Sequence, residues 1–287
     1  MNEKKTDSLL HLIAEENQFK LHKFLPLSGG DINQVFLLTS ESGKKVVAKI
    51  NDAHNFPGMF RAEKAGLEAL TSCNAINIPE VVATGTSGEY SYLLLQHIES
   101  GKKSPRFWEI FGKQLAALHK CTSEKFGFSE DNYIGSLPQQ NNTCSSASEF
   151  YISQRLEPQL RIAEEKGFNL KVKNSFFKTI SEIIPQEPPS LLHGDLWNGN
   201  FLVNSEGLPC LIDPAVAYAP REMDLSMMKL FGGFDDSLFQ AYHGEFRIQD
   251  GFEERIVLWQ LYYLLVHLNI FGAGYRKSVA DILQQYS

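Results

Sequence analysis

One short segment of the chain carries acidic and amide side chains at a spacing that suits phosphoryl transfer. In the run His193-Gly194-Asp195-Leu196-Trp197-Asn198-Gly199-Asn200, Asp195 stands five residues before Asn200, and Asp213 follows thirteen residues later. Phosphoryl transfer needs a carboxylate to accept the proton of the attacking hydroxyl, and oxygen ligands to hold Mg²⁺. Kinase catalytic loops place an Asp and an Asn at this spacing, with a metal-binding Asp after the next strand. We therefore predict Asp195 as the general base and Asn200 and Asp213 as Mg²⁺ ligands.

Three residues around this segment are expected to support it. His193 is expected to brace the loop through hydrogen bonds and not to act as a base. Trp197 either stacks on the apolar face of a substrate or belongs to the core. Asp224, in the run Arg221-Glu222-Met223-Asp224-Leu225, either braces the catalytic loop, which we prefer, or caps a helix. For the whole segment, a polar turn with a capping Asp is the non-catalytic alternative.

A cation for the phosphates is predicted in the first third of the chain. The run Val46-Val47-Ala48-Lys49-Ile50 places Lys49 among the apolar residues of a strand, as in the kinase pattern. A lysine in a strand is commonly solvated at a sheet edge, so this position alone is weak support. Glu63 follows in a predicted helix and could orient the lysine, so we predict a Lys49–Glu63 pair.

Two backbone segments would complete a nucleotide site. Gly29 and Gly30 lie in a turn whose N–H groups could cradle phosphates, although a plain hairpin turn would use the same residues. Gln96 to Ile98 is predicted as a hinge whose main chain hydrogen-bonds adenine, with Gln96 and Ile98 as its contacts. The cofactors predicted from these residues are ATP and Mg²⁺.

The character of the sequence changes near residue 96. Before it, we expect strands at 24–27, 34–39, 44–50, 81–83 and 92–96 and one amphipathic helix at 60–72. Beyond it, we expect a helix capped by Ser104-Pro105, helices at 149–166, 172–184 and 253–271, and short strands at 190–192, 201–203 and 208–212. The prediction is an α+β fold with two lobes. Residues 1–96 form a small antiparallel sheet lobe with one helix that binds ATP, and residues 97–287 form a larger, mainly α-helical lobe for catalysis and substrate binding.

Composition narrows the function classes. The net charge of −7 disfavours nucleic acid as a partner. The four cysteines, Cys73, Cys121, Cys144 and Cys210, form no C-x-x-C pair, so we expect neither a zinc site nor a disulfide framework. The longest apolar stretch, 256–271, is shorter than the roughly 20 residues of a membrane span, and no signal peptide is recognised. We expect a cytoplasmic protein without a membrane partner.

A longer pattern around the catalytic segment is specific. It runs from Leu191 to Phe234 and combines His-Gly-Asp-Leu-Trp with Ile-Asp-Pro-Ala; segments 131–139, 155–160, 241–244 and 262–275 match as well. Over nearly its whole length the chain resembles the fructosamine kinase (ketosamine-3-kinase) family. The resemblance implies a protein-kinase-like two-lobed fold and an ATP-dependent phosphotransferase (EC 2.7.1 type) acting on the 3-hydroxyl of ketosamines. These are ribulosamine- or fructosamine-type glycation adducts of free amines or protein lysines, and their phosphorylation leads to deglycation.

Other acceptors stay open. Related hydroxyl kinases for aminoglycosides, choline or homoserine share the Asp195, Asn200 and Asp213 pattern. A catalytically inactive ATP-binding scaffold is expected to have lost one of these residues or Lys49, and all four are present. The sequence leaves open the preferred ketosamine, free versus protein-bound substrate, and monomer versus homodimer. It also leaves open which aromatic residues line the acceptor pocket; for Trp259, Tyr262 and His267 we expect core positions.

Overall fold

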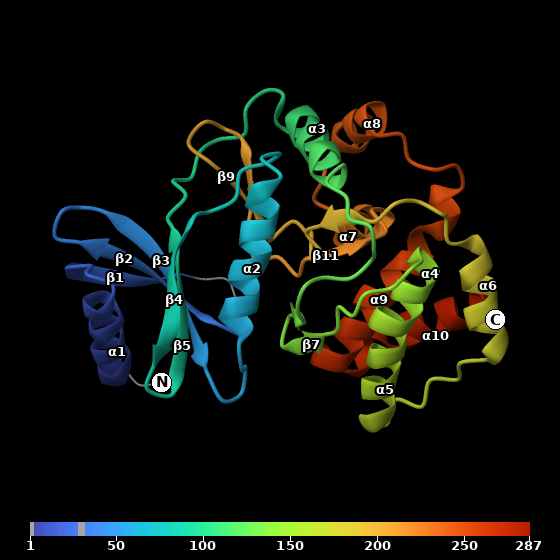
Figure 1. The fold of residues 1–287 in the computed structure, drawn as a ribbon, viewed down its shortest axis with the longest axis horizontal. Coiled ribbons are helices and arrows are strands. Elements are labelled where there is room, and N and C mark those ends of the chain that lie inside the picture. Colours follow the sequence, from blue (N-terminus) through green and yellow to red (C-terminus); the bar gives the residue numbers. More distant parts are fainter. Residues whose placement is uncertain (1–2, 28–31) are drawn as a thin grey trace.

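A five-stranded antiparallel sheet is joined to a larger, mainly helical part (Figure 1). The computed structural model describes residues 3–27 and 32–287. The strand order is β1-β2-β3-β5-β4, and helix α2 follows β3 in the chain. The elements of this first lobe are α1 (Glu3–Glu16), β1 (Leu21–Leu27), β2 (Gln34–Ser40), β3 (Lys45–Asp52), α2 (Met59–Ser72), β4 (Val81–Ser87) and β5 (Tyr90–Gln96).

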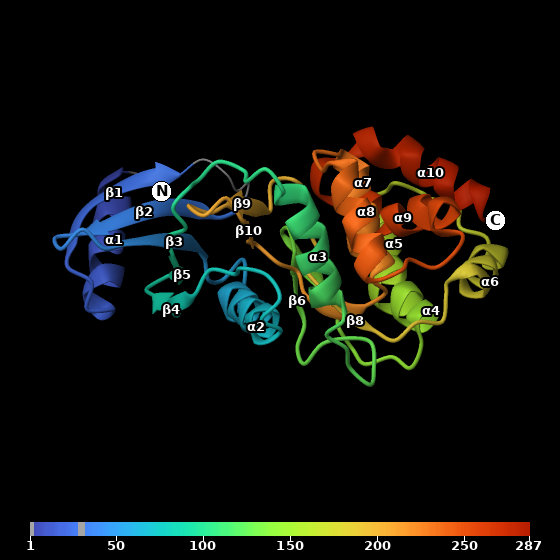
Figure 2. The same ribbon diagram turned by 90° about the horizontal axis from the view of Figure 1, so that it is seen from above.

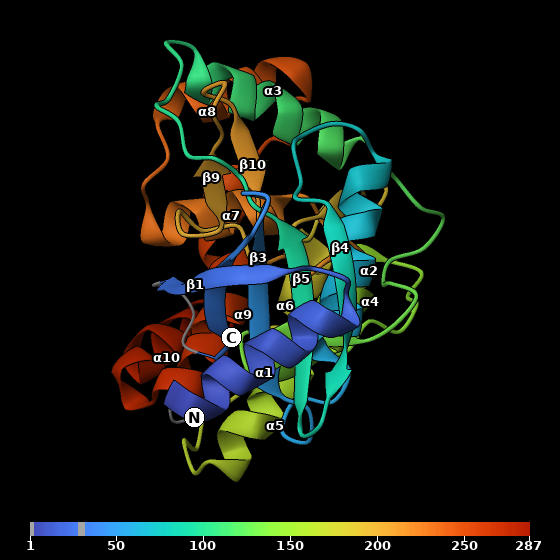
Figure 3. The same ribbon diagram turned by 90° about the vertical axis from the view of Figure 1, so that its left-hand side faces the viewer.

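The two faces of this sheet are covered by different helices. Helix α1 lies across one face, where its Leu10 and Ile13 pack in one cluster with Val46 and Ile50 of β3 (Figure 3). Helix α2 covers the other face (Figure 1). Because successive side chains of a strand point to opposite faces, Lys49 lies on the α2 side. The sheet thereby directs the Lys49 side chain toward α2.

The helical part is built around one long buried helix, α9 (Phe252–Phe271), whose contacts include α5, α7 and α10 (Figure 2). Three two-stranded sheets, β6 with β7, β8 with β11 and β9 with β10, lie on the side of the first lobe. No helix in the described ranges is long and apolar enough to span a membrane. The remaining elements are α3 (Phe107–His119), β6 (Asn132–Ile134), β7 (Leu137–Gln139), α4 (Ala147–Phe150), the π-helix η1 (Tyr151–Leu156), α5 (Glu157–Glu165), α6 (Asn174–Ile183), β8 (Ser190–Leu192), β9 (Phe201–Val203), β10 (Pro209–Leu211), β11 (Ala217–Ala219), α7 (Glu222–Phe231), α8 (Asp236–Glu245), η2 (Ala273–Tyr275) and α10 (Arg276–Gln285).

The end of α2 is anchored to the helical part. Leu70 of α2 shares a core cluster with Phe111 and Leu115 of α3. Next to this cluster, Cys73 is joined to Cys121 by a disulfide that spans 48 residues of sequence. This single pairing was not predicted, because the two cysteines are distant in sequence and only the packing of α2 against α3 brings their Cα atoms to 6.2 Å.

Most predicted elements are present, and three details of the prediction were wrong. The first lobe has two helices, not one, since Leu9, Leu10, Ile13 and Ala14 form the buried stripe of α1. The helix expected at 149–166 is interrupted by η1, which ends two residues before Pro158; a proline lacks an N–H and clashes with the preceding turn. Helix α3 begins at Phe107 with Arg106 as its N-cap, so Ser104 is no cap.

The disulfide gives a prediction for stability. Closing a loop of 48 residues restricts the unfolded chain and is expected to stabilise the fold by about 4 kcal/mol. Reduction should therefore lower the free energy of unfolding measured in urea. The double variant Cys73→Ser/Cys121→Ser serves as a control that does not respond to the reductant. Alkylation of both thiols in the unreduced folded protein would contradict this linkage.

Candidate active site

A cavity of about 420 Å³ lies where the sheet lobe meets the helical part. Its wall has a polar end with charged residues from both lobes and a largely apolar end formed by α7, α9 and neighbouring loops. Residues of the polar end are Lys49, Glu63, Asp195, Asn200 and Asp213; residues of the other end include Trp197, Met227, Phe231, Tyr263, Val266, His267, Ile270 and Phe271. The cavity can therefore hold a charged group and an organic group side by side.

Lys49 is the cation at the polar end. Its Nζ donates to Glu63 Oε1 at 2.6 Å and to Asp213 Oδ1 at 3.0 Å. Burial alone would lower the pKa of Lys49, but the charges of Asp213 and Glu63 outweigh it and raise the pKa above its ordinary value. The side chain thus stays a cation. Glu63 of α2 orients it, and it points toward Asp213 in the loop after β10.

The loop between β8 and β9 brings Asp195 and Asn200 together. Asn200 Nδ2 donates to the backbone oxygen of Asp195 at 2.8 Å and to its Oδ2 at 3.0 Å. Burial raises the pKa of Asp195 to about 7; Asp213 and Asp224 add to the shift, and the hydrogen bond from Asn200 opposes it. A carboxylate with a pKa near neutrality is suited to accept a proton from a hydroxyl group.

The amide of Asn200 is oriented so that it could hold a cation. All its hydrogen-bond partners, including the backbone oxygen of Asp213 at 3.5 Å, are acceptors. The NH₂ group must face them, which leaves Oδ1 for a metal. Asp213 adds a carboxylate that is 44% exposed. In the described part of the chain no cluster of three His, Cys, Asp or Glu residues could hold a metal alone. Two oxygen ligands suit Mg²⁺, which usually binds one or two protein groups together with phosphates and water.

Asp224 and His193 hold the loop that carries Asp195 and Asn200. Asp224 is fully buried, and its carboxylate accepts the N–H groups of His193 at 2.8 Å and Gly194 at 2.9 Å. His193 Nε2 donates to the oxygen of Ile212 at 2.8 Å, and Nδ1 accepts the N–H of Asp195 at 3.3 Å. Since both nitrogens are engaged and burial lowers its pKa, His193 is a neutral brace in this geometry.

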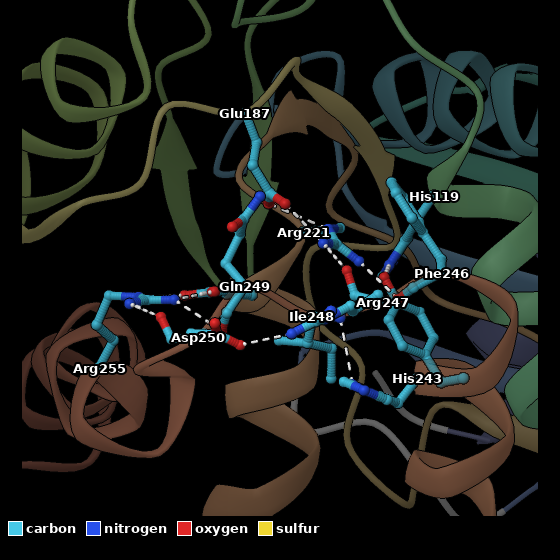
Figure 4. A network of polar contacts seen from close by, with 12 residues as sticks. His119, Glu187, Arg221, His243, Phe246, Arg247, Ile248, Gln249, Asp250 and Arg255 are labelled. Atoms are coloured by element: carbon cyan, nitrogen blue, oxygen red, sulfur yellow. Dashed lines mark hydrogen bonds and ion pairs between the residues drawn. The ribbon is translucent and has the colours of Figure 1, made fainter.

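Buried arginines hold the start of α7, the helix that carries Asp224. The Arg221 guanidinium donates to Glu187 and to the backbone oxygens of Phe246 and Arg247, as Figure 4 shows. Arg255 of α9 pairs with Glu222 at 2.6 Å. These contacts fix the first turn of α7 from two sides, and the position of Asp224 follows from them.

Known proteins resemble this chain over nearly its whole length. The sequence pattern of the fructosamine kinase family matches residues 4–287. The chain belongs to the fructosamine kinase family. A probable ketoamine kinase from Synechocystis sp. is 36% identical over 270 residues (93% of this chain, 91% of that protein). The chloroplastic protein-ribulosamine 3-kinase of Arabidopsis thaliana is 34% identical over 285 residues (96% and 86%).

A solved structure supports the same relationship. A candidate fructosamine-3-kinase from Haemophilus somnus 129PT superposes with a TM-score of 0.86 at 27% identity, covering 97% of each chain. The fold of this fructosamine kinase family member is the two-lobed α+β fold of protein-kinase-like phosphotransferases, which confirms the predicted fold class.

Two glycines shape the loop at 193–200 of this family member. Gly194 has φ +83°, and a Cβ there would lie 1.9 Å from the backbone oxygen of Ala215. At Gly199 a Cβ would lie 2.3 Å from the indole of Trp197. The indole therefore lies over the loop backbone, 39% exposed at the cavity wall, and not in the core.

Of the four predicted nucleotide contacts, Gln96 and Ile98 are not among the described residues that line the cavity. Gly29 and Gly30 lie outside the described residues. Gln96 ends β5 with an exposed side chain, and its N–H donates to the oxygen of Glu80 at 2.8 Å. Ile98 is half-buried in the segment that leaves β5. The N–H of Gln96 already has a partner, so it is not free for adenine in this structure.

Several residues of the cavity wall were not predicted from the sequence, and one of them was expected in the core. His267 lines the cavity, contrary to the expected core position, whereas Trp259 and Tyr262 are buried outside it. Tyr263, Phe231 and Phe271 also line the cavity. They lie on helices that are apolar on most sides, so no periodic pattern marks which residues face a ligand. His119, a buried partner of Asp224 at 3.2 Å, belongs to no motif.

The brace under the loop gives a prediction. Asp224→Asn would turn an NH₂ group toward an N–H donor, so it should cost about 3 kcal/mol of unfolding free energy. It should also lower kcat, because the loop loses its fixed geometry. Urea denaturation and turnover assays would measure both. Asp236→Asn, at an exposed position of α8, should stay within about 0.5 kcal/mol of the parent. If Asp224→Asn were as stable as the parent, this would contradict the proposal that Asp224 braces the loop.

Proposed function

We propose that this protein is an ATP- and Mg²⁺-dependent kinase that phosphorylates the 3-hydroxyl of ketosamines. One observation carries the proposal: a single cavity joins the Lys49, Asp195 and Asp213 cluster to an aromatic end large enough for an organic acceptor. Membership of the fructosamine kinase family supports the choice of acceptor. A relative named protein-ribulosamine 3-kinase supports the position of transfer.

The proposed division of labour follows the two lobes. Residues 1–96 would bind ATP, with Lys49 on the α- and β-phosphates, Glu63 orienting it, and Gly29 and Gly30 near the phosphates. Residues 97–287 would carry the chemistry and the acceptor site. The hinge at 96–98 remains our proposal for adenine, through backbone groups other than the N–H of Gln96.

The reaction would proceed by direct transfer to the acceptor. Asp195 accepts the proton of the attacking 3-hydroxyl, and the oxygen forms a bond to the γ-phosphorus. The bond between that phosphorus and the β–γ bridging oxygen breaks, and ADP leaves. Bound Mg²⁺, held by Asn200 and Asp213, would neutralise charge on the phosphates. Asp224 and His193 would keep the loop in place, and Trp197 would stack against the acceptor.

The acceptor would be a small ketosamine or a glycated lysine of a protein. A 3-phosphate of such an adduct falls apart, so the reaction would remove glycation and restore the amine. Its phosphate donor, ATP, is a cytoplasmic metabolite, and we propose the cytoplasm as the place of action.

The acceptor can be tested directly. With Mg²⁺ and ATP, the purified protein should phosphorylate a ribulosamine or a fructosamine, and the product should lose its amine on standing. Choline, homoserine and an aminoglycoside should show no turnover in the same assay. Turnover of one of these alone would replace the proposed acceptor, and absence of turnover with all of them would favour an inactive ATP-binding protein.

The role of Asp195 can be tested separately. Asp195→Asn should lower kcat at least ~100-fold, the usual effect of losing a general base. Binding of ATP, measured by calorimetry, should change little, because Asp195 would face the acceptor and not the nucleotide. An exposed carboxylate, Asp281, replaced by Asn serves as the matched control with parent-like kcat. A near-normal kcat for Asp195→Asn would remove it from the role of base.

A further inference from the structure

Helix α2 carries Glu63, the partner of Lys49, and its two ends are held in different ways. The far end belongs to a core cluster with α3, and a disulfide follows it. The N-cap of α2 is Gly58, which has no side chain to accept the free N–H groups of the first turn. Glu63 lies only one turn after Met59, where α2 begins. The contact with Lys49 therefore depends on what holds this first turn.

The helical lobe holds the start of α2 through β6 and the residues before it. The hydroxyl of Tyr133, in β6, donates to the backbone oxygen of Pro57 at 2.9 Å, one residue before the N-cap. Glu130, shortly before β6, pairs with Arg61 of α2 at 3.2 Å. The Arg61 side chain is 78% exposed, so this ion pair is expected to contribute little. Of these two contacts between the lobes, the Tyr133 hydroxyl is therefore the more important.

The hairpin of β6 and β7 is itself fixed to the helical lobe. Asn132 Nδ2 donates to the backbone oxygen of Val216 at 2.8 Å, and Gln139 Nε2 donates to that of Ala215 at 3.1 Å. Both amide side chains are buried. Both acceptors lie directly after Asp213, the proposed metal ligand. The hairpin is therefore a firm support, fixed to the same loop as one partner of the buried lysine.

Tyr133 also has a place in the cavity wall. The residue is half-buried and lines the cavity. Its hydroxyl already has a partner in Pro57, which is not among the described residues of the wall. A phenylalanine in place of Tyr133 would keep an aromatic ring in the wall and remove only the link to Pro57.

We propose that Tyr133 is a positioning residue for the Lys49–Glu63 pair. Its hydroxyl holds the start of α2 against the helical lobe, and the position of α2 directs the Glu63 carboxylate to Lys49. This assignment rests on the proposed function in one respect, that Lys49 binds the phosphates of ATP, and it does not depend on the identity of the acceptor.

Binding of ATP tests the assignment without an acceptor. Tyr133→Phe should raise the Kd of Mg²⁺-ATP, measured by calorimetry, about 5-fold, the equivalent of one hydrogen bond. Tyr286→Phe is the matched control. The Tyr286 hydroxyl also donates to a backbone oxygen, that of Glu254 at 2.8 Å, and neither residue is in the described cavity wall. Its Kd should equal that of the parent. An unchanged Kd in Tyr133→Phe, or an equal rise in both variants, would overturn the assignment.

A double variant tests whether Tyr133 acts through α2. Glu63→Gln removes the charge that orients Lys49. In this background, Tyr133→Phe should change the Kd of Mg²⁺-ATP by less than about 2-fold, because the two changes affect one interaction. A further rise of about 5-fold would show that the hydroxyl acts independently of Glu63, and would contradict the proposal.

Kinetics separate this assignment from the proposed acceptor. With a ketosamine, Tyr133→Phe should lower kcat/KM for ATP about 5-fold and leave the KM of the ketosamine unchanged. A higher KM of the ketosamine with an unchanged Kd of ATP would assign the hydroxyl to the acceptor and overturn the proposal. A parent that binds ATP without phosphorylating ketosamines overturns the proposed function, and the Kd values still decide this assignment. If the parent does not bind ATP, both are wrong.

Discussion

The buried ammonium group of Lys49 is the constraint on which the geometry of the cavity depends. Its partners Glu63 and Asp213 come from α2 and from the loop after β10, so one charge connects the sheet, its helix and the helical lobe. A buried charge without partners is strongly unfavourable, so moving Glu63 or Asp213 away from Lys49 would cost much free energy. The relative position of the two lobes at the polar end therefore follows from this cluster.

A second buried charge, of opposite sign, sets the shape of the loop that carries Asp195 and Asn200. Asp224 receives its hydrogen bonds from the loop and from His119, whose other nitrogen contacts the hydroxyl of Tyr242 at 2.8 Å. Satisfied networks of this kind are rigid, because each group has few alternative partners in a low-dielectric interior. The helical lobe thus uses polar side chains in its interior to hold Asp195 and Asn200 in position, while apolar helices supply the stability.

How far the sequence predicts this molecule depends on how local the information is. Asp195, Asn200 and Asp213 lie in one short stretch, and the spacing predicted their proximity; the Lys49–Glu63 contact followed from a strand and a helix with clear patterns. The disulfide, the role of His119 and the cavity position of His267 depend on packing between distant elements. Helix α9 is apolar on nearly all sides, so its sequence cannot indicate which residues face a ligand. Pro158 was a local sign of the interruption at η1, but the apolar periodicity of the segment favoured one continuous helix.

Lys49, Asp195, Asn200 and Asp213 are proposed to form a single phosphoryl-transfer site that faces an acceptor at α9. A crystal structure with Mg²⁺, a non-hydrolysable ATP analogue and a ribulosamine measures this most directly. It should place Lys49 Nζ on the α- and β-phosphates, the metal on Asn200 Oδ1 and Asp213, and the 3-hydroxyl of the sugar within hydrogen-bond distance of Asp195. A metal held by other residues, or a sugar bound away from Asp195, would contradict the account.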